Sequence, residues 1–188
     1  MLSLICAFAI GHQSSNYLPA GPRIEVKMKS GGTFVITTDP KASPKTVAHI
    51  LDLVGRKFYD NQRVHRVEYW VTQWGDPQSK TKPMNDPKMG DGDTGYRLPF
   101  EMSDIDFTRG VVGIASDGLQ NGGDCQLFVI KQDRIYLYHS YAVVGKVTSG
   151  MDTVDKIDKG DRIASMRVLP IQKKVVIPAL PILPPHHR

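Results

Sequence analysis

The 188-residue chain has a length that suits one domain with a substantial core, and its formal net charge of +5 is mild. Its Lys and Arg residues are scattered, with no basic stripe and no nucleic-acid motif, so the charge indicates solubility and excludes a nucleic-acid partner. No apolar run is long enough to span a membrane, and two cysteines do not make a disulfide framework. We expect one globular domain that is a monomer.

Residues 1–22 differ in composition from the rest of the chain. Residues 2–10 are apolar, and no charged residue precedes Arg23. Ala9-Ile10-Gly11 resembles a signal cleavage site, but the basic residues that normally precede such an apolar run are absent. Two alternatives stay open. Either residues 1–22 are a remnant signal peptide and linker of an exported protein, periplasmic or extracellular, or they are a loosely docked tail of a cytoplasmic one.

The domain is predicted to begin near Arg23 with a β-hairpin. Ile24, Val26 and Met28 alternate with charged residues, which is the pattern of a half-buried strand. The turn at residues 30–32 contains two glycines, and residues 33–38 form the returning strand.

A helix is predicted next, from Ser43 to Gly55. Ser43 suits the N-cap, Pro44 suits the first helical position, and Gly55 suits the end. Between them the apolar residues recur at helical spacing: Val47, Ile50, Leu51 and Val54.

The chemistry of the chain is concentrated in residues 58–77, FYDNQRVHRVEYWVTQWGDP. Valine and aromatic residues predict strand here, yet Arg66 and Gln73 lie among them. An arginine in a strand needs a partner or a water-facing cleft. The two residues are seven positions apart, and on one continuous strand that odd offset would place them on opposite faces. If they act together, the strand must bulge or bend between them.

Residues 78–95 form a loop rich in Pro, Asp, Lys and Gly. It contains G-x-G-x-x-G at Gly90, Gly92 and Gly95. The context argues against a dinucleotide site, because no strand precedes the motif and Asp91 and Asp93 would repel a pyrophosphate.

The remaining chain predicts more short strands and a second helix. Strands are expected at residues 111–115 and 125–130, where Cys125 is interpreted as a buried structural thiol. A short helix is expected over residues 152–157, and residues 163–177 alternate again and would close the sheet. Residues 178–188 are proline-rich and predicted to be extended; their paired histidines are not expected to form a metal site.

Several blocks resemble the cyclophilin-type peptidyl-prolyl cis-trans isomerases. The first is His65-Arg66-Val67, then Trp70-Val71-Thr72-Gln73, then Gly75-Asp76-Pro77. The next are Ala115-Ser116, Gln126 and Phe128, followed by Tyr136-Leu137 and the run from Tyr141 to Val147. Together they place the resemblance on residues 23–177. Three departures stand out: one residue is missing before Trp70, Trp74 replaces a glycine, and Tyr136 replaces a tryptophan.

The resemblance implies a mainly β fold, a closed antiparallel β-barrel of eight strands capped by two α-helices. It also implies isomerisation of X-Pro peptide bonds in proline-containing peptides and unfolded protein clients, to assist folding. By resemblance, Arg66 and Gln73 are catalytic and His65 has a supporting, hydrogen-bonding role. The substrate-binding residues would be Trp70, Val71, Ala115, Ser116, Phe128, Tyr136, Leu137 and Tyr141.

The chemistry of this reaction needs no cofactor and no metal. Amide resonance gives the X-Pro bond a rotational barrier of ~18–20 kcal/mol, while both isomers are populated. A pocket that holds the ring and a donor that favours the twisted amide are enough. The alternative is a proline-peptide binding or chaperone module with little turnover, in which the three departures have reshaped the groove.

Overall fold

The computed structural model describes residues 17–170. The apolar residues 2–10, the proline-rich tail and residues 171–177 of the expected last strand lie outside the described residues. The described part forms one antiparallel sheet of eight strands. No helix within residues 17–170 has the length and apolar character needed to cross a membrane.

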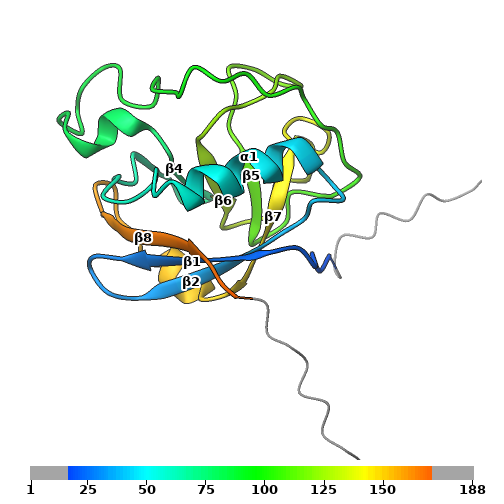
Figure 1. Ribbon diagram of the computed structural model, residues 1–188, viewed down its shortest axis with the longest axis horizontal. Coiled ribbons are helices and arrows are strands. Elements are labelled where there is room, and N and C mark those ends of the chain that lie inside the picture. Colours follow the sequence, from blue (N-terminus) through cyan, green and yellow to red (C-terminus); the bar gives the residue numbers. More distant parts are fainter. Residues whose placement is uncertain (1–16, 171–188) are drawn as a thin grey trace, which may run out of the picture.

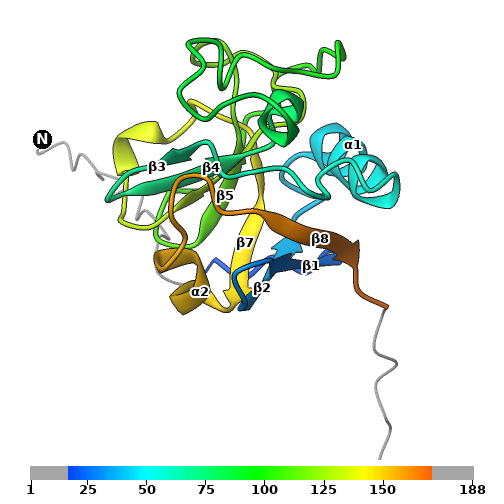
Figure 2. The ribbon, with the colours of Figure 1, turned by 90° about the vertical axis from the view of Figure 1, so that its left-hand side faces the viewer.

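The strands are short, as the sequence predicted. They are β1 (Arg23–Met28), β2 (Thr33–Thr38), β3 (Arg66–Val67), β4 (Val71–Trp74), β5 (Val111–Ile114), β6 (Leu127–Ile130), β7 (Val143–Ser149) and β8 (Ile163–Val168). In the sheet they follow the order β3-β4-β6-β5-β7-β2-β1-β8, and the strands are labelled in Figures 1 and 2. The hairpin of β1 and β2 forms as expected, with Val26 opposite Phe34.

The sheet curls, but it does not close into a barrel by a continuous ladder. Its two end strands, β3 and β8, are not paired with each other. The chain before β3 meets the chain before β8 through one isolated bridge, between Arg63 and Arg162, and a few backbone hydrogen bonds such as that from Val64 N to Asp161 O. The expected closed barrel is therefore wrong in this respect. The reason is that β3 is only two residues long and is preceded by a turn in which Asn61 adopts positive φ.

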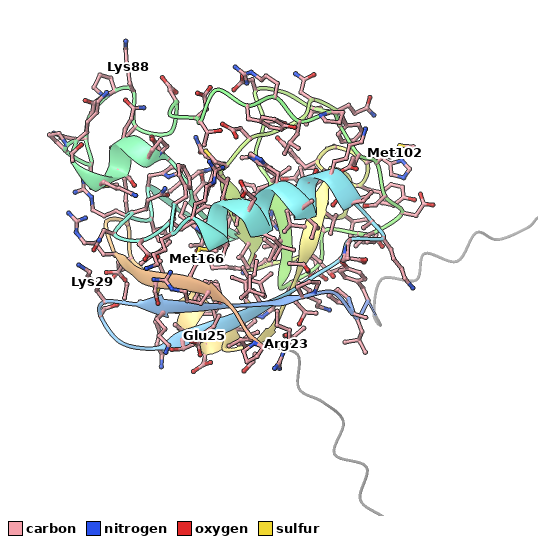
Figure 3. The ribbon with its side chains drawn as sticks, viewed as in Figure 1. Arg23, Glu25, Lys29, Lys88, Met102 and Met166 are labelled. Carbon is pink, nitrogen blue, oxygen red and sulfur yellow. The ribbon has the colours of Figure 1, made fainter. Side chains whose placement is uncertain are left out.

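Two helices pack against the sheet. Helix α1 (Pro44–Gly55) covers the larger hydrophobic core and contacts β8, and the short α2 (Met151–Asp155) lies beside β2 (Figures 1 and 2). Met166 of β8 is fully buried in this core (labelled in Figure 3). A smaller cluster lies on the other side of the sheet, built on Val71, Phe107, Val111, Phe128, Ile130, Leu137 and Val143.

Helix α1 begins and ends where the sequence predicted, but its cap is different. Ser43 is the N-cap residue, yet its hydroxyl donates to the carbonyl of Val143 and caps no helical N–H. The carboxylate of Glu101 accepts from the N–H groups of Lys45 and Thr46 at 3.0 and 2.8 Å. A distant side chain thus satisfies the first-turn donors that a local cap normally serves.

The described part of the expected linker packs on the domain. The Tyr17 hydroxyl donates to Asp39 at 3.0 Å, and the N–H of Gly21 donates to Thr38 O at 2.8 Å. Burial, together with the neighbouring Asp39 carboxylate, raises the pKa of Tyr17 far above its ordinary range. Residues 17–22 are therefore attached to the domain by hydrogen bonds.

Candidate active site

The two predicted catalytic residues face each other across a tight hairpin. Arg66 and Gln73 are direct partners in the β3–β4 ladder, and Nη1 of Arg66 donates to Oε1 of Gln73 at 3.3 Å. The N–H of Glu68 donates to Val71 O at 2.9 Å and closes the turn. Directly opposed residues of an antiparallel pair share one face. The bend that the sequence required is therefore a hairpin, and no bulge is involved.

Gln73 is itself held by a second amide. Its Nε2 donates to Oε1 of Gln126 at 3.0 Å, and Nε2 of Gln126 donates to the carbonyls of Gly90 and Gly92 at 2.6 and 2.9 Å. This chain of hydrogen bonds connects Arg66 to the loop that precedes β5. The same loop passes close to Asp76: a Cβ on Gly92 would lie 2.0 Å from a carboxylate oxygen of Asp76, so this position requires glycine.

Beside Arg66 lies a hollow of about 230 Å³, which we call the aromatic pocket. Nine residues line it, and all nine were predicted as site residues: Arg66, Trp70, Val71, Gln73, Ala115, Ser116, Phe128, Leu137 and Tyr141. They come from β3, the β3–β4 turn, β4, β6 and the segments after β5 and before β7. Figure 2 shows the β3–β4 hairpin at one side of the molecule, away from α1.

The wall of the aromatic pocket is a group of packed rings. Phe128 stacks on Phe107 with 5.7 Å between ring centroids, and Tyr141 meets Phe128 edge-on at 5.4 Å. A Cβ on Gly113 would lie 2.4 Å from the Phe128 ring, so this close approach requires glycine. Phe107 is fully buried and was not singled out by the sequence, because it lies in an irregular segment outside the recognised blocks.

Two of the predicted site residues lie outside the lining of the aromatic pocket. Tyr136 is 73% exposed, while its neighbour Leu137 faces the pocket. His65 is buried, and the Gln126 side chain lies close enough to influence its ring. Burial lowers the pKa of His65, because the charged ring would be desolvated.

Next to the aromatic pocket lies a second, polar hollow of about 100 Å³, which we call the acidic hollow. The two share Gln73, Ala115 and Ser116. Four aspartates and one arginine also line the acidic hollow: Asp91, Asp93, Asp117, Asp124 and Arg97. Most of this lining comes from loops, and no pattern in the sequence indicates that these aspartates would meet.

Asp124 attaches the loop after Gly92 to helix α1. It is buried, and its Oδ1 accepts from the hydroxyl of Thr94 at 2.6 Å and lies 3.1 Å from Nε2 of His49. Tyr96 stacks on the His49 ring at 4.6 Å. Lys88, which precedes Gly92 in the chain, is exposed at the edge of the molecule (Figure 3).

Cys125 and Trp74 both belong to the interior. The Cys125 thiol is buried and donates to Gly75 O at 3.3 Å, as predicted for a structural thiol, and burial raises its pKa. Trp74 is 1% exposed and meets Phe34 edge-on at 5.9 Å. It faces the core, on the opposite side of β4 from Gln73, so it does not reshape the groove.

The described residues contain no group of three or more His, Cys, Asp or Glu side chains that could hold a metal ion. The fold and the site together define a mainly β protein with an aromatic pocket, a guanidinium at its rim and an amide that orients it. That combination suits the recognition of a small apolar ring next to a polar amide.

Comparison with known proteins identifies the family. The model of the family described as cyclophilin type peptidyl-prolyl cis-trans isomerase/CLD matches residues 23–178. A probable peptidyl-prolyl cis-trans isomerase of Brucella abortus is 38% identical over 139 residues, covering 72% of this chain and 70% of the relative. Peptidyl-prolyl cis-trans isomerase B of Bacillus subtilis is 30% identical over 144 residues, covering 75% of this chain and 94% of the relative. The chain belongs to the cyclophilin-type peptidyl-prolyl cis-trans isomerases and is an isomerase of that type.

A solved structure shows the same fold at low sequence identity. The cyclophilin-type isomerase of Cryptosporidium parvum superimposes with a TM-score of 0.68 at 20% identity, covering 80% of this chain and 99% of that chain. The same Cryptosporidium protein has also been solved in the presence of the dipeptide Ala-Pro, with a TM-score of 0.67. The fold is therefore cyclophilin-like: mainly β, with an eight-stranded antiparallel sheet and two helices.

Proposed function

We propose that the aromatic pocket receives the proline ring of an X-Pro peptide and that Arg66 is the donor that accelerates rotation. The observation that carries this proposal is the position of Arg66. Its guanidinium is fixed by Gln73 at the rim of the pocket whose wall is Phe128. The presence of Ala-Pro in the Cryptosporidium structure supports proline-containing peptides as the ligand class.

The reaction involves no bond cleavage. As the X-Pro amide twists, its nitrogen becomes pyramidal and regains a lone pair, which can then accept a hydrogen bond. A guanidinium donor therefore binds the twisted state more strongly than either planar isomer, and that difference lowers the barrier. Within residues 17–170 the bonds of Arg66 to other side chains use Nε and Nη1, which leaves Nη2 for the substrate.

The pocket residues divide into ring contacts and peptide contacts. We propose that Trp70, Val71, Phe128 and Leu137 contact the proline ring and that Tyr141 lies at the rim. The backbone at Ser116 would pair with the peptide, and Ala115 would border the pocket; both residues line the aromatic pocket and the acidic hollow. We also propose that residues 23–177 form the isomerase unit, which works as a monomer on unfolded clients and needs no cofactor.

A second function, binding of proline peptides with little turnover, is favoured by one observation. The Arg66 guanidinium is ion-paired with Glu68 at 2.7 Å, and this neighbouring negative charge would partly offset the stabilisation that the guanidinium gives to the twisted amide. One experiment separates the two functions. Exchange spectroscopy by NMR on an X-Pro peptide measures isomerisation, and a titration of the same peptide measures affinity. We expect both; binding without isomerisation above background would contradict the enzyme.

A further inference from the structure

The turn between β3 and β4 contains a carboxylate that contacts both sides of the aromatic pocket's rim. Oε1 of Glu68 accepts from Nε of Arg66 at 2.7 Å, and Oε2 accepts from the indole Nε1 of Trp70 at 2.7 Å. The Arg66 guanidinium also lies over the Trp70 ring, 5.3 Å from its centroid. One side chain thus fixes the donor and one of the ring contacts relative to each other.

Arg66 needs such a support because it is not held by burial. Its side chain is 44% exposed, and an arginine has about 2 kcal/mol of rotamer entropy to lose. Gln73 holds Nη1 at 3.3 Å, which is a long hydrogen bond. Glu68 adds a short, charge-assisted bond on the opposite edge of the guanidinium. A donor held on two edges need not reorganise when the amide twists.

We propose that Glu68 is a positioning residue for the isomerisation, and that its carboxylate fixes the Arg66 guanidinium and the Trp70 indole for the proline peptide. This inference rests on the proposed role of Arg66. It assigns a function to the position where the chain departs from the family pattern, since Glu68-Tyr69 replaces the longer stretch before the aromatic residue.

The pH dependence of the rate follows from the groups around Glu68. The hydrogen bond from Arg66 lowers the pKa of Glu68, so the carboxylate is charged at neutral pH and is protonated only below the ordinary range of a glutamate. The other charged residues nearby are Arg134 and Lys131. The Arg134 guanidinium lies 5.1 Å from the Trp70 ring centroid, and the backbone N–H of Lys131 donates to the backbone carbonyl of Trp70. His65 is buried beside Arg66 and also titrates in acid. It is present in every variant below, so differences between variants isolate Glu68.

The first experiment compares the wild type with Glu68→Gln and Glu68→Ala by NMR exchange on an X-Pro peptide. We expect kcat/KM to fall about tenfold for Glu68→Ala and about threefold for Glu68→Gln at pH 7, because small displacements of a catalytic group have large effects on rate. Peptide affinity should change less than about twofold, because the ring contacts other than Trp70 are untouched. The wild-type rate should fall in acid, and this decline should be weaker in Glu68→Gln.

A double-mutant comparison tests whether Glu68 acts through Arg66. In an Arg66→Ala background, Glu68→Ala should have a much smaller effect on the rate, limited to what Glu68 contributes through Trp70. The matched control is Glu25→Gln on β1, whose carboxylate pairs with Lys27 at 3.0 Å with the same spacing in sequence. We expect this control to keep the wild-type rate and pH profile.

The indole N–H resonances give a readout that does not depend on activity. The chain has two tryptophans, and the Trp74 indole nitrogen has no partner in the described structure, so it serves as an internal reference. Glu68→Gln should shift the Trp70 signal and leave the Trp74 signal in place.

Two results would overturn the inference while leaving the enzyme intact. One is an active wild type whose Glu68 variants keep or exceed its rate. The other is an equal loss of rate from Glu68→Ala with and without Arg66. A wild type that binds the peptide without isomerising it would overturn the proposed function as well.

Discussion

The aromatic pocket and the acidic hollow share three residues but are built in different ways. Much of the aromatic pocket is lined by residues of paired strands, and Gln73 and Phe128 are direct partners in the β4–β6 ladder. The acidic hollow is lined largely by loops, which are fixed by hydrogen bonds such as those from Gln126 to Gly90 and Gly92. The first surface is thus fixed by the sheet, and the second by a few polar side chains. Substitutions in the two should therefore have different consequences.

The largest effect is expected where the pocket wall belongs to the smaller hydrophobic cluster. Phe128→Ala should lower the free energy of unfolding by about 3–5 kcal/mol, because it removes a buried ring that stacks on Phe107. It should also weaken peptide binding along with the rate. The exposed Leu119, 63% accessible, is the control: Leu119→Ala should change stability by less than about 0.5 kcal/mol. Denaturant unfolding measures the stability change, and peptide titration measures the change in binding. Equal free energies of unfolding for Phe128→Ala and Leu119→Ala would contradict the packing of Phe128 described above.

Two arginines at the two hollows give the sharpest functional comparison. Arg66→Ala should reduce kcat/KM for an X-Pro peptide by at least ~10²-fold, or roughly 3 kcal/mol, with a much smaller change in affinity. Arg97 lines the acidic hollow, is 66% exposed and lies 3.4 Å from Asp117. Because surface pairs contribute little, Arg97→Ala should keep the rate within about threefold. An Arg66→Ala variant with full rate would rule out the mechanism and leave the fold unaffected.

Gln126 links the two hollows, so its removal should affect the aromatic pocket from a distance. Gln126→Ala leaves the amide of Gln73 without its acceptor and frees the carbonyls of Gly90 and Gly92. Losing such a hydrogen bond costs about 1–2 kcal/mol, which corresponds to a decrease of about tenfold in kcat/KM if Gln73 loses its orientation. The exposed Gln132→Ala is the matched control. NMR exchange measures the rate of each variant. Equal rates for Gln126→Ala and Gln132→Ala would show that Gln73 is positioned without Gln126.

The smallest effect is expected from His65, which lies beneath the rim and does not line either hollow. Burial lowers its pKa, so the folded protein favours the neutral ring. As the pH falls below about 6.5, the unfolded chain takes up a proton that the folded protein does not, and stability decreases. Thermal unfolding between pH 7 and pH 5 should therefore show a smaller decrease for His65→Gln than for the wild type. The difference between the two curves is the measurement, because the other five histidines of the chain are present in both proteins. Parallel curves would show that His65 is not buried as a neutral ring.

How far the sequence predicted the site depends on how each residue is placed. Arg66, Gln73 and Phe128 lie in short strand blocks with a recognisable order, so nine lining residues were predicted together. Phe107 and the aspartates of the acidic hollow lie in irregular segments, where no periodicity shows which side chains will meet. The closure of the sheet was predicted wrongly for a related reason. It depends on whether residues 61–65 pair as a strand, and the positive φ of Asn61 is not visible in the residue pattern.

The cap of α1 by Glu101 affects the order in which the chain can fold. The first-turn N–H groups of the helix meet an acceptor 55 and 56 residues further along the chain, and Ser43 donates to a carbonyl 100 residues away. Contacts at such separations require closure of long loops and form late. During synthesis, the start of α1 cannot be completed until residue 101 has left the ribosome. Its last turn, which depends only on local bonds such as that from Arg56 N to Asp52 O, can form earlier. The helix is therefore expected to grow toward its own N-terminus as the sheet assembles beneath it.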